Sequence, residues 1–236
     1  MKLEIGVLPA GAPSSVAQRI EEMRESIAEA ARALDRDPDA VVLVGVTKRK
    51  SIETVRQAFA AGLTDFGENY LQEARDKFAG LGPPGAVTPR KHFIGHIQTN
   101  KAKAIVETFD VVQSVDRLEA GVAIARAQEK LGKRVRVLVQ VNISPSERFG
   151  VEPGQAPELA RRLREDEGLE VDGIMAIGPF TEDSHVTKEA FETAARAFDA
   201  VGGSTLSLGM SGDWREALAA GSTMLRLGTA LFGART

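Results

Sequence analysis

Apolar residues recur at helical spacing near the start of the chain, between Ser14 and Leu34. Ile20, Met23 and Ile27 are three or four residues apart, and the positions between them are polar or charged. This pattern predicts an amphipathic helix. Either of the serines at positions 14 and 15 is a suitable N-cap for it.

Beyond this helix, short runs rich in valine and isoleucine alternate with polar turns and helical patterns. The runs that predict strands are Val41–Val46, Thr64–Gly67, His92–Gly95, Phe109–Ser114, Val135–Asn142, Val171–Ile177, Thr205–Gly209 and Met224–Gly228. The helical patterns between them include Ile52–Ala61, Tyr70–Phe78, Arg117–Leu131, Ala156–Glu165 and Lys188–Val201. Asp116 and Glu119 have the spacing of a capping box for the third of these helices.

This alternation of strands and helices favours parallel pairing with right-handed crossovers. Eight such units predict an α/β fold, a closed (β/α)8 (TIM) barrel with the helix at 14–34 as an extra N-terminal element. An open doubly wound sheet is the alternative. The length of 236 residues suits one such barrel, and no linker or low-complexity tract interrupts it. We therefore expect a single domain over residues 1–236.

Composition excludes several classes of function. A net charge of −3 does not suggest a nucleic-acid-binding surface. The absence of cysteine rules out disulfides, thiolate metal sites and a cysteine nucleophile, and the histidines lack the spacing of metal ligands. No apolar run approaches the roughly 20 residues of a membrane span. Residues 1–11 do not have the pattern of a signal peptide, so we expect a cytoplasmic protein.

Lys48 is the sharpest candidate for chemistry, because it directly follows a continuous apolar run. Residues just beyond the strands of a (β/α)8 barrel gather at the rim where active sites form. A free lysine has a pKa of about 10.4. Desolvation and the positive charges of Arg49 and Lys50 would lower that pKa and favour Schiff-base chemistry. Taken alone, however, residues 47–50 are better interpreted as a solvated basic turn.

Two glycine-bearing segments follow the last two predicted strands. Gly209–Gly212, which contains Met210 and Ser211, precedes a helix expected at 213–220, and Gly228-Thr229 follows the eighth strand. Backbone N–H groups at a helix N-terminus, together with a hydroxyl group, form an anion site. Barrels of this kind often bind phosphate at these two loops. Each glycine alone is equally consistent with a turn, but their joint placement favours phosphate.

Arg226 lies within the last apolar run, so its charge needs a partner inside the barrel. A structural carboxylate and a bound ligand are both consistent with this position, and the sequence does not choose between them.

Taken together, these segments resemble the family of pyridoxal 5′-phosphate (PLP) homeostasis proteins, relatives of the N-terminal barrel of alanine racemase. The segments that carry the resemblance are Val44–Lys48, Phe66–Glu73, His92–Lys101, Ser114–Arg117, Val139–Ser144, Leu206–Trp214 and Arg226–Gly233. Two places depart from the family pattern. Lys91 stands where the family usually has tryptophan, and the loop after the fifth strand reads Glu147-Arg148-Phe149-Gly150.

The resemblance implies a cofactor-binding set at the rim, namely Lys48, Asn69, His96, Met210, Ser211, Arg226, Gly228 and Thr229. In this set Lys48 forms a Schiff base with PLP, Asn69 lies near the ring and Arg226 faces the pyridine nitrogen. The serine, the threonine and the glycine hold the phosphate.

An arginine at the pyridine nitrogen has a consequence for catalysis. Most PLP enzymes place a carboxylate there, which keeps the nitrogen protonated and makes the ring a strong electron sink. A permanently charged arginine cannot accept that proton. Racemases of this fold add a tyrosine base from a second domain, whereas the only tyrosine here is Tyr70. We therefore expect PLP storage and delivery, with PLP-requiring apoenzymes as possible recipients, and no robust turnover.

The sequence leaves two alternatives open. A racemase-like PLP enzyme would need a general base opposite Lys48, for which His96 and Tyr70 are the candidates. A barrel that binds a sugar phosphate would keep the phosphate loops and give Lys48 no role. The resemblance also implies a monomer, as is usual in the family.

Overall fold

The computed structural model describes residues 15–79, 81, 88–144 and 149–233. Its centre is a closed barrel of eight parallel strands in sequential order, in which β8 pairs back onto β1. The strands are β1 (Val42–Val46), β2 (Asp65–Glu68), β3 (Arg90–Phe93), β4 (Val111–Val115), β5 (Arg136–Val141), β6 (Glu170–Ala176), β7 (Thr205–Ser207) and β8 (Met224–Leu227). The predicted (β/α)8 barrel is confirmed, and the open sheet is wrong.

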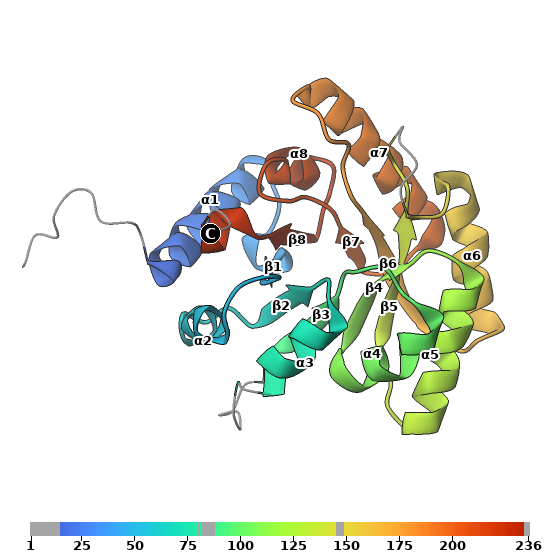
Figure 1. Cartoon of the computed structure of the whole chain (residues 1–236). Coiled ribbons are helices and arrows are strands. Elements are labelled where there is room, and N and C mark those ends of the chain that lie inside the picture. The colour runs from blue at the N-terminus through green and yellow to red at the C-terminus, as the bar shows by residue number, and fades with distance from the viewer. Residues whose placement is uncertain (1–14, 80, 82–87, 145–148, 234–236) are drawn as a thin grey trace, which may run out of the picture.

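Helices surround the barrel (Figure 1). They are α1 (Val16–Ala33), α2 (Ile52–Ala60), α3 (Leu71–Ala79), α4 (Ala102–Thr108), α5 (Leu118–Leu131), α6 (Ala156–Glu165), α7 (Ser184–Val201), α8 (Trp214–Ala219) and α9 (Thr229–Phe232). The extra helix α1 precedes the first strand, as expected, and packs against α2 and α9. None of the helices in the described ranges is long and apolar enough to span a bilayer.

The starts of α1 and α5 show how local sequence sets helix ends. Ser15 Oγ accepts a hydrogen bond from the N–H of Gln18 (3.2 Å), and Gln18 Oε1 accepts one from the N–H of Ser15 (2.7 Å). This is a complete capping box. The capping box expected from Asp116 and Glu119 is wrong, because α5 begins after Arg117 with no side-chain cap. Asp116 instead binds the guanidinium of Arg117 (2.6 Å), and a charge-assisted bond of this kind is the stronger one.

Two other elements differ from the expectation. The third strand begins at Arg90, two residues before the predicted start, because its pairing with β2 begins there. The pattern also does not predict α4, whose seven residues run almost directly into the apolar stretch of β4. Its buried positions Ala102, Ile105 and Val106 do have helical spacing. A short helix beside a strand is therefore hard to separate from it by hydrophobicity alone.

The strands bury both faces, but the two faces differ in character. Under the helices the packing is apolar, and Phe93 of β3 lies against Phe109 with ring centroids 5.1 Å apart. Inside the barrel, Gln113 of β4 contacts Ser207 of β7 and Met224 of β8, so polar side chains cross the interior. Buried polar groups of this kind must satisfy one another. Because all eight strands are parallel, their C-terminal ends share one rim.

Candidate functional site

A cavity of about 400 Å³ opens at the C-terminal rim of the barrel. This volume lies within the range of about 300–1,000 Å³ that small-molecule sites occupy. The residues that line it are Val46, Lys48, Asn69, Ile94, Met175, Ile177, Phe180, Met210, Ser211, Gly212, Arg226, Gly228 and Thr229. The structure thus brings together every member of the expected cofactor-binding set except His96.

A buried ionic cluster anchors the backbone that carries Lys48. Lys77 of α3 donates to the carbonyl of Thr47 (2.6 Å) and to Glu68 Oε1 (2.5 Å). The hydroxyl of Thr47 donates to the same carboxylate oxygen (2.6 Å), and Glu73 lies 2.8 Å from the ammonium of Lys77. Thr47 and Glu68 are fully buried. The cluster therefore fixes the point at which the chain leaves β1 and Lys48 enters the cavity.

The hydrogen bonds that Lys77 and Thr47 donate stabilise the charged form of the buried Glu68 carboxylate. Burial raises the pKa of Glu68 above its ordinary value, although the hydrogen bonds from Lys77 and Thr47 act in the opposite direction. The second carboxylate oxygen, Oε2, is buried and has no hydrogen-bond partner among the described residues. Loss of Lys77 or Thr47 would leave this carboxylate without compensation.

Arg49 and Lys50 do not provide the positive charge that their position suggests. The backbone N–H of Arg49 donates to Glu73, and the ammonium of Lys50 donates to the carbonyls of Phe232 (3.1 Å) and Gly233 (3.3 Å). Neither residue lines the cavity. The cation that shares the cavity with Lys48 is Arg226.

Arg226 is almost completely buried, with 4% of its surface exposed. Its Nη1 donates to the carbonyl (2.7 Å) and the hydroxyl (2.7 Å) of Ser207, and its Nη2 donates to the carbonyl of Ala176 (2.8 Å). Burial lowers the pKa of Arg226 to about 10, a shift that the charge of Asp213 opposes. No carboxylate in the described part of the chain forms an ion pair with Arg226. Of the two partners that the sequence allows for Arg226, a structural carboxylate and a bound ligand, the carboxylate is therefore not found among the described residues.

The loops after β7 and β8 meet at Ser211. Its Oγ accepts hydrogen bonds from the N–H groups of Gly228 (3.2 Å) and Ala230 (3.1 Å), at the start of α9. Gly209 allows this approach with a φ of +90°, because a Cβ there would lie 2.7 Å from that of Ala217. Ser211 Oγ is thus the acceptor on which two N–H donors converge, and such a pair of donors also suits an oxyanion.

Asn69, directly after β2, also lines the cavity. Its Oδ1 is buried and has no hydrogen-bond partner among the described residues. The loop after β3 packs directly onto its backbone, and a Cβ on Gly95 would lie 2.0 Å from the Asn69 carbonyl oxygen. An unpartnered polar atom on a cavity wall is available to a ligand group.

His96 and Tyr70, the two candidate bases, lie apart from this cavity. His96 stacks on Phe149, with ring centroids 3.9 Å apart, and its Nδ1 lies 3.7 Å from Asp116 Oδ2. Tyr70 is 50% exposed. Neither residue lines the cavity. A position just after a strand therefore places a residue at the rim, but it does not determine where the side chain points.

Of the two departures from the family pattern, Lys91 does not line the cavity. The backbone N–H of Lys91 donates to Asp110 Oδ2 (2.9 Å), and its ammonium lies 3.9 Å from the same oxygen. In the loop after the fifth strand, Glu147 and Arg148 lie outside the described residues.

The apolar walls of the cavity consist of residues that a pattern of polar rim positions does not predict. Val46, Ile94 and Ile177 lie at or just after the ends of their strands, and Phe180 follows them in the loop after β6 with 99% of its surface exposed. Alternation along each strand would have pointed to Val46, since alternate residues face the interior. No comparable pattern marks a loop residue such as Phe180.

The cavity combines one lysine, one buried arginine, an anion-binding loop pair and apolar walls. These groups suit a flat, apolar ring that carries both a phosphate and a carbonyl group reactive toward an amine. The unpartnered Asn69 Oδ1 and the N–H groups that converge on Ser211 fit polar groups on such a ligand.

Comparison with known proteins identifies the family. Residues 19–236 match the family described as alanine racemase, N-terminal domain. The chain is 41% identical, over 226 residues, to the pyridoxal phosphate homeostasis protein of Pseudomonas aeruginosa, and the match covers 94% of this chain and 96% of that protein. The chain belongs to the pyridoxal phosphate homeostasis protein family.

Other relatives agree with this membership. The Escherichia coli K12 member is 36% identical over 231 residues, covering 94% of this chain and 97% of that protein. Among solved structures, PipY of Synechococcus elongatus PCC7942 with PLP bound has a TM-score of 0.79 and 31% identity, covering 93% of this chain and 100% of that chain. Alanine racemase from E. faecalis, with a TM-score of 0.63 and 18% identity, covers 89% of this chain and 58% of that chain. It shows the shared barrel fold alone.

The buried cluster predicts an unequal effect of two similar substitutions. Glu68→Gln removes the fully buried charge that pairs with Lys77, and should lower the free energy of unfolding by about 3–5 kcal/mol. Glu170→Gln breaks an ion pair with Arg136 in which both side chains are more than half exposed, and should cost less than about 1 kcal/mol. Urea unfolding measures both values. Equal losses would contradict the role of the cluster.

Proposed function

We propose that this protein binds PLP in the rim cavity, through a Schiff base between the PLP aldehyde and Nζ of Lys48. The observation that carries this proposal is that Lys48, Arg226 and the N–H groups around Ser211 face one cavity of suitable volume. The bound PLP in the PipY structure supports the same cofactor for this family member.

Each lining residue has a part in this proposal. Ser211, Gly228 and Thr229 bind the phosphate at the N-terminus of α9, and Asn69 bonds a polar group of the ring. Arg226 donates a hydrogen bond to the pyridine nitrogen. When bound, PLP supplies an electrophilic aldehyde and, in enzymes, an electron sink.

Met210 and His96 have less defined parts. Met210 lines the cavity and is 40% exposed, which suits a side chain that covers the bound ring from the solvent side. His96 stays a prediction, since its ring lies against Phe149 and would have to turn to reach the cofactor.

We further propose storage and delivery of PLP without robust catalysis. Arg226 is held by Ser207 and Ala176 and carries no acceptor for a proton, so the pyridine nitrogen stays unprotonated. Lys48 and Arg226 are the only ionisable side chains among the residues that line the cavity. A racemase-like enzyme, the alternative, needs a second general base that this lining does not contain.

The remaining parts of the proposal concern the protein in its cell. We expect one domain over residues 1–236, monomeric and cytoplasmic, with PLP-requiring apoenzymes as recipients of the cofactor. A sugar phosphate is the less well supported candidate ligand, because it would give no role to Lys48, which shares the cavity with the buried Arg226.

Replacement of Lys48 tests the Schiff base. With PLP added, the wild-type protein should show an absorption band that free PLP lacks, and borohydride should fix the label on the peptide that contains Lys48. Lys48→Ala should lose both signals. Lys103→Ala, which removes an exposed lysine on α4, should keep both. A Lys48→Ala protein that still forms the same band would overturn the assignment.

Replacement of Ser211 tests the phosphate site. Ser211→Ala should weaken PLP binding by roughly tenfold, since a hydrogen bond to a charged group contributes about 1.5–3 kcal/mol. Binding of pyridoxal, which has no phosphate, should change little. Ser204→Ala, at the other end of the barrel, is the control and should bind both ligands as the wild type does. An equal loss for PLP and pyridoxal would place the phosphate elsewhere.

Exchange at the α-carbon separates the carrier from the racemase-like enzyme. The PLP-loaded protein should release deuterium from α-deuterated alanine or serine no faster than free PLP does, because no second base lines the cavity. The rate of release is followed by NMR or mass spectrometry. Release well above the rate with free PLP would favour the enzyme.

A further inference from the structure

A chain of hydrogen bonds crosses the barrel interior and ends at Arg226. Nη1 of Arg226 lies 2.7 Å from Ser207 Oγ, and Ser207 Oγ lies 2.7 Å from Gln113 Oε1. Gln113 Nε2 lies 2.9 Å from His92 Nδ1, and His92 Nε2 lies 2.9 Å from Asp65 Oδ1. All five residues are buried, with at most 6% of their surface exposed. The chain joins β8 and β7 to β4, β3 and β2.

Arg226 at one end can only donate hydrogen bonds, and the carboxylate of Asp65 at the other end can only accept them, which sets the direction of every bond between them. Arg226 can only donate, so the hydroxyl of Ser207 accepts from it and donates its own proton to Gln113. The amide of Gln113 then donates to His92 Nδ1. His92 is therefore the tautomer with its proton on Nε2, which donates to the carboxylate of Asp65. A chain in which every group donates onward is strengthened by mutual polarisation.

The opposite orientation of the Gln113 amide does not satisfy these groups. It would place an N–H₂ donor against Ser207 Oγ, which already accepts from Arg226, and the serine proton would lose its acceptor. His92 would then need protons on both ring nitrogens. One orientation alone satisfies all five side chains.

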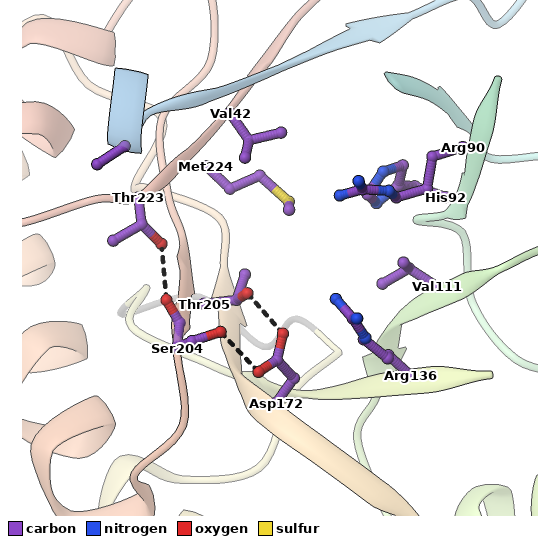
Figure 2. Close-up of a pocket in the computed structure, with 11 residues that line it drawn as sticks. Val42, Arg90, His92, Val111, Arg136, Asp172, Ser204, Thr205, Thr223 and Met224 are labelled. Atoms are coloured by element: carbon purple, nitrogen blue, oxygen red, sulfur yellow. Dashed lines mark hydrogen bonds between the residues drawn. The ribbon is translucent and has the colours of Figure 1, made fainter. Parts of the chain in front are cut away.

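The far end of the chain lies at the opposite mouth of the barrel. Figure 2 shows His92 beside Arg90 in a separate cavity of about 240 Å³, with Arg136 and Asp172 nearby. Arg90 lies 3.5 Å from Asp65 Oδ1. The hydroxyl of Thr64 also donates to Asp65 Oδ2 (2.8 Å). Asp65 therefore ends the chain as a carboxylate.

We propose that Ser207, Gln113 and His92 are positioning residues for Arg226, and that they set the guanidinium orientation from the opposite end of the barrel. The inference rests on the proposed PLP function, in which Arg226 faces the pyridine nitrogen. Two backbone carbonyls also hold the guanidinium, but Ser207 Oγ is its only side-chain acceptor in the described structure. A broken chain leaves Arg226 charged and buried but free to tilt away from the ring nitrogen.

Two buried glutamines in the same barrel allow a matched test. Gln113→Met removes both side-chain bonds of the chain at nearly constant volume. Gln140→Met removes a glutamine of β5 that is 7% exposed and bonds the carbonyl of Phe149 (2.8 Å), outside the chain. Gln113→Met and Ser207→Ala should weaken PLP binding about tenfold and shift the absorption band of bound PLP. Gln140→Met should stay within about twofold of wild type.

A cofactor analogue identifies the ring nitrogen as the affected contact. In 1-deaza-PLP a carbon replaces the pyridine nitrogen, so the position of Arg226 no longer contributes through that atom. The affinity ratio between wild type and Gln113→Met should then fall to about one. An equal loss with PLP and its deaza analogue, or no loss with either, would overturn the positioning role.

A measurement without cofactor separates this inference from the proposed function. Nitrogen-15 NMR of the apo protein, which has three histidines, should show His92 neutral with its proton on Nε2 in the wild type. Gln113→Met should change the Nδ1 shift of His92. A proton on Nδ1 in the wild type would overturn the chain, whether or not PLP binds. Failure of the wild type to bind PLP, with the expected tautomer present, would overturn the proposed function instead.

Discussion

The guanidinium of Arg226 carries a positive charge into the interior of a closed barrel, where water does not compensate it. No carboxylate of the described residues is paired with it, and its bonds go to two carbonyls and the hydroxyl of Ser207. Desolvation of an ion is costly unless its hydrogen bonds are nearly ideal. The polar interior of the barrel follows from this constraint, since Gln113, His92 and Asp65 continue the chain that begins at Ser207.

The same constraint shapes the cavity at the rim. Arg226 provides a fixed hydrogen-bond donor to the cavity. Lys77 and Glu68 bind Thr47, and these bonds determine where the neighbouring Lys48 reaches the cavity. Arg226 belongs to β8, and Lys48 follows β1 by two residues, in a turn whose backbone is held by this anchor. A site held in this way keeps its geometry before any ligand arrives, which reduces the entropy lost on binding.

In the proposed function, reversible binding and weak catalysis are two results of one arrangement. A donor at the pyridine nitrogen stabilises the neutral ring and limits its capacity to accept electrons. The cavity lining offers no second base, since His96 lies on Phe149 and Tyr70 is half exposed. Alanine racemase from E. faecalis shares the barrel, and a shared fold does not by itself imply a shared function.

The sequence by itself determined the barrel, because alternating apolar runs and helical patterns allow few other arrangements of parallel strands. It also located Lys48, Arg226 and the two loops at Ser211 and Gly228, since each lies in or just after a strand and all strands end at one rim. The same reasoning placed His96 at the rim but could not tell that its ring turns toward Phe149.

Only the tertiary structure decided which side chains meet. It showed that Arg49 and Lys50 do not line the cavity and that Arg226 is the cation that shares it with Lys48. It also revealed the hydrogen-bond chain from Arg226 to Asp65, whose members come from five strands and one of whose bonds joins residues 94 positions apart. Periodicity along a chain gives the face on which a residue lies. The partner across a barrel depends on register and closure, which exist only once all eight strands have paired.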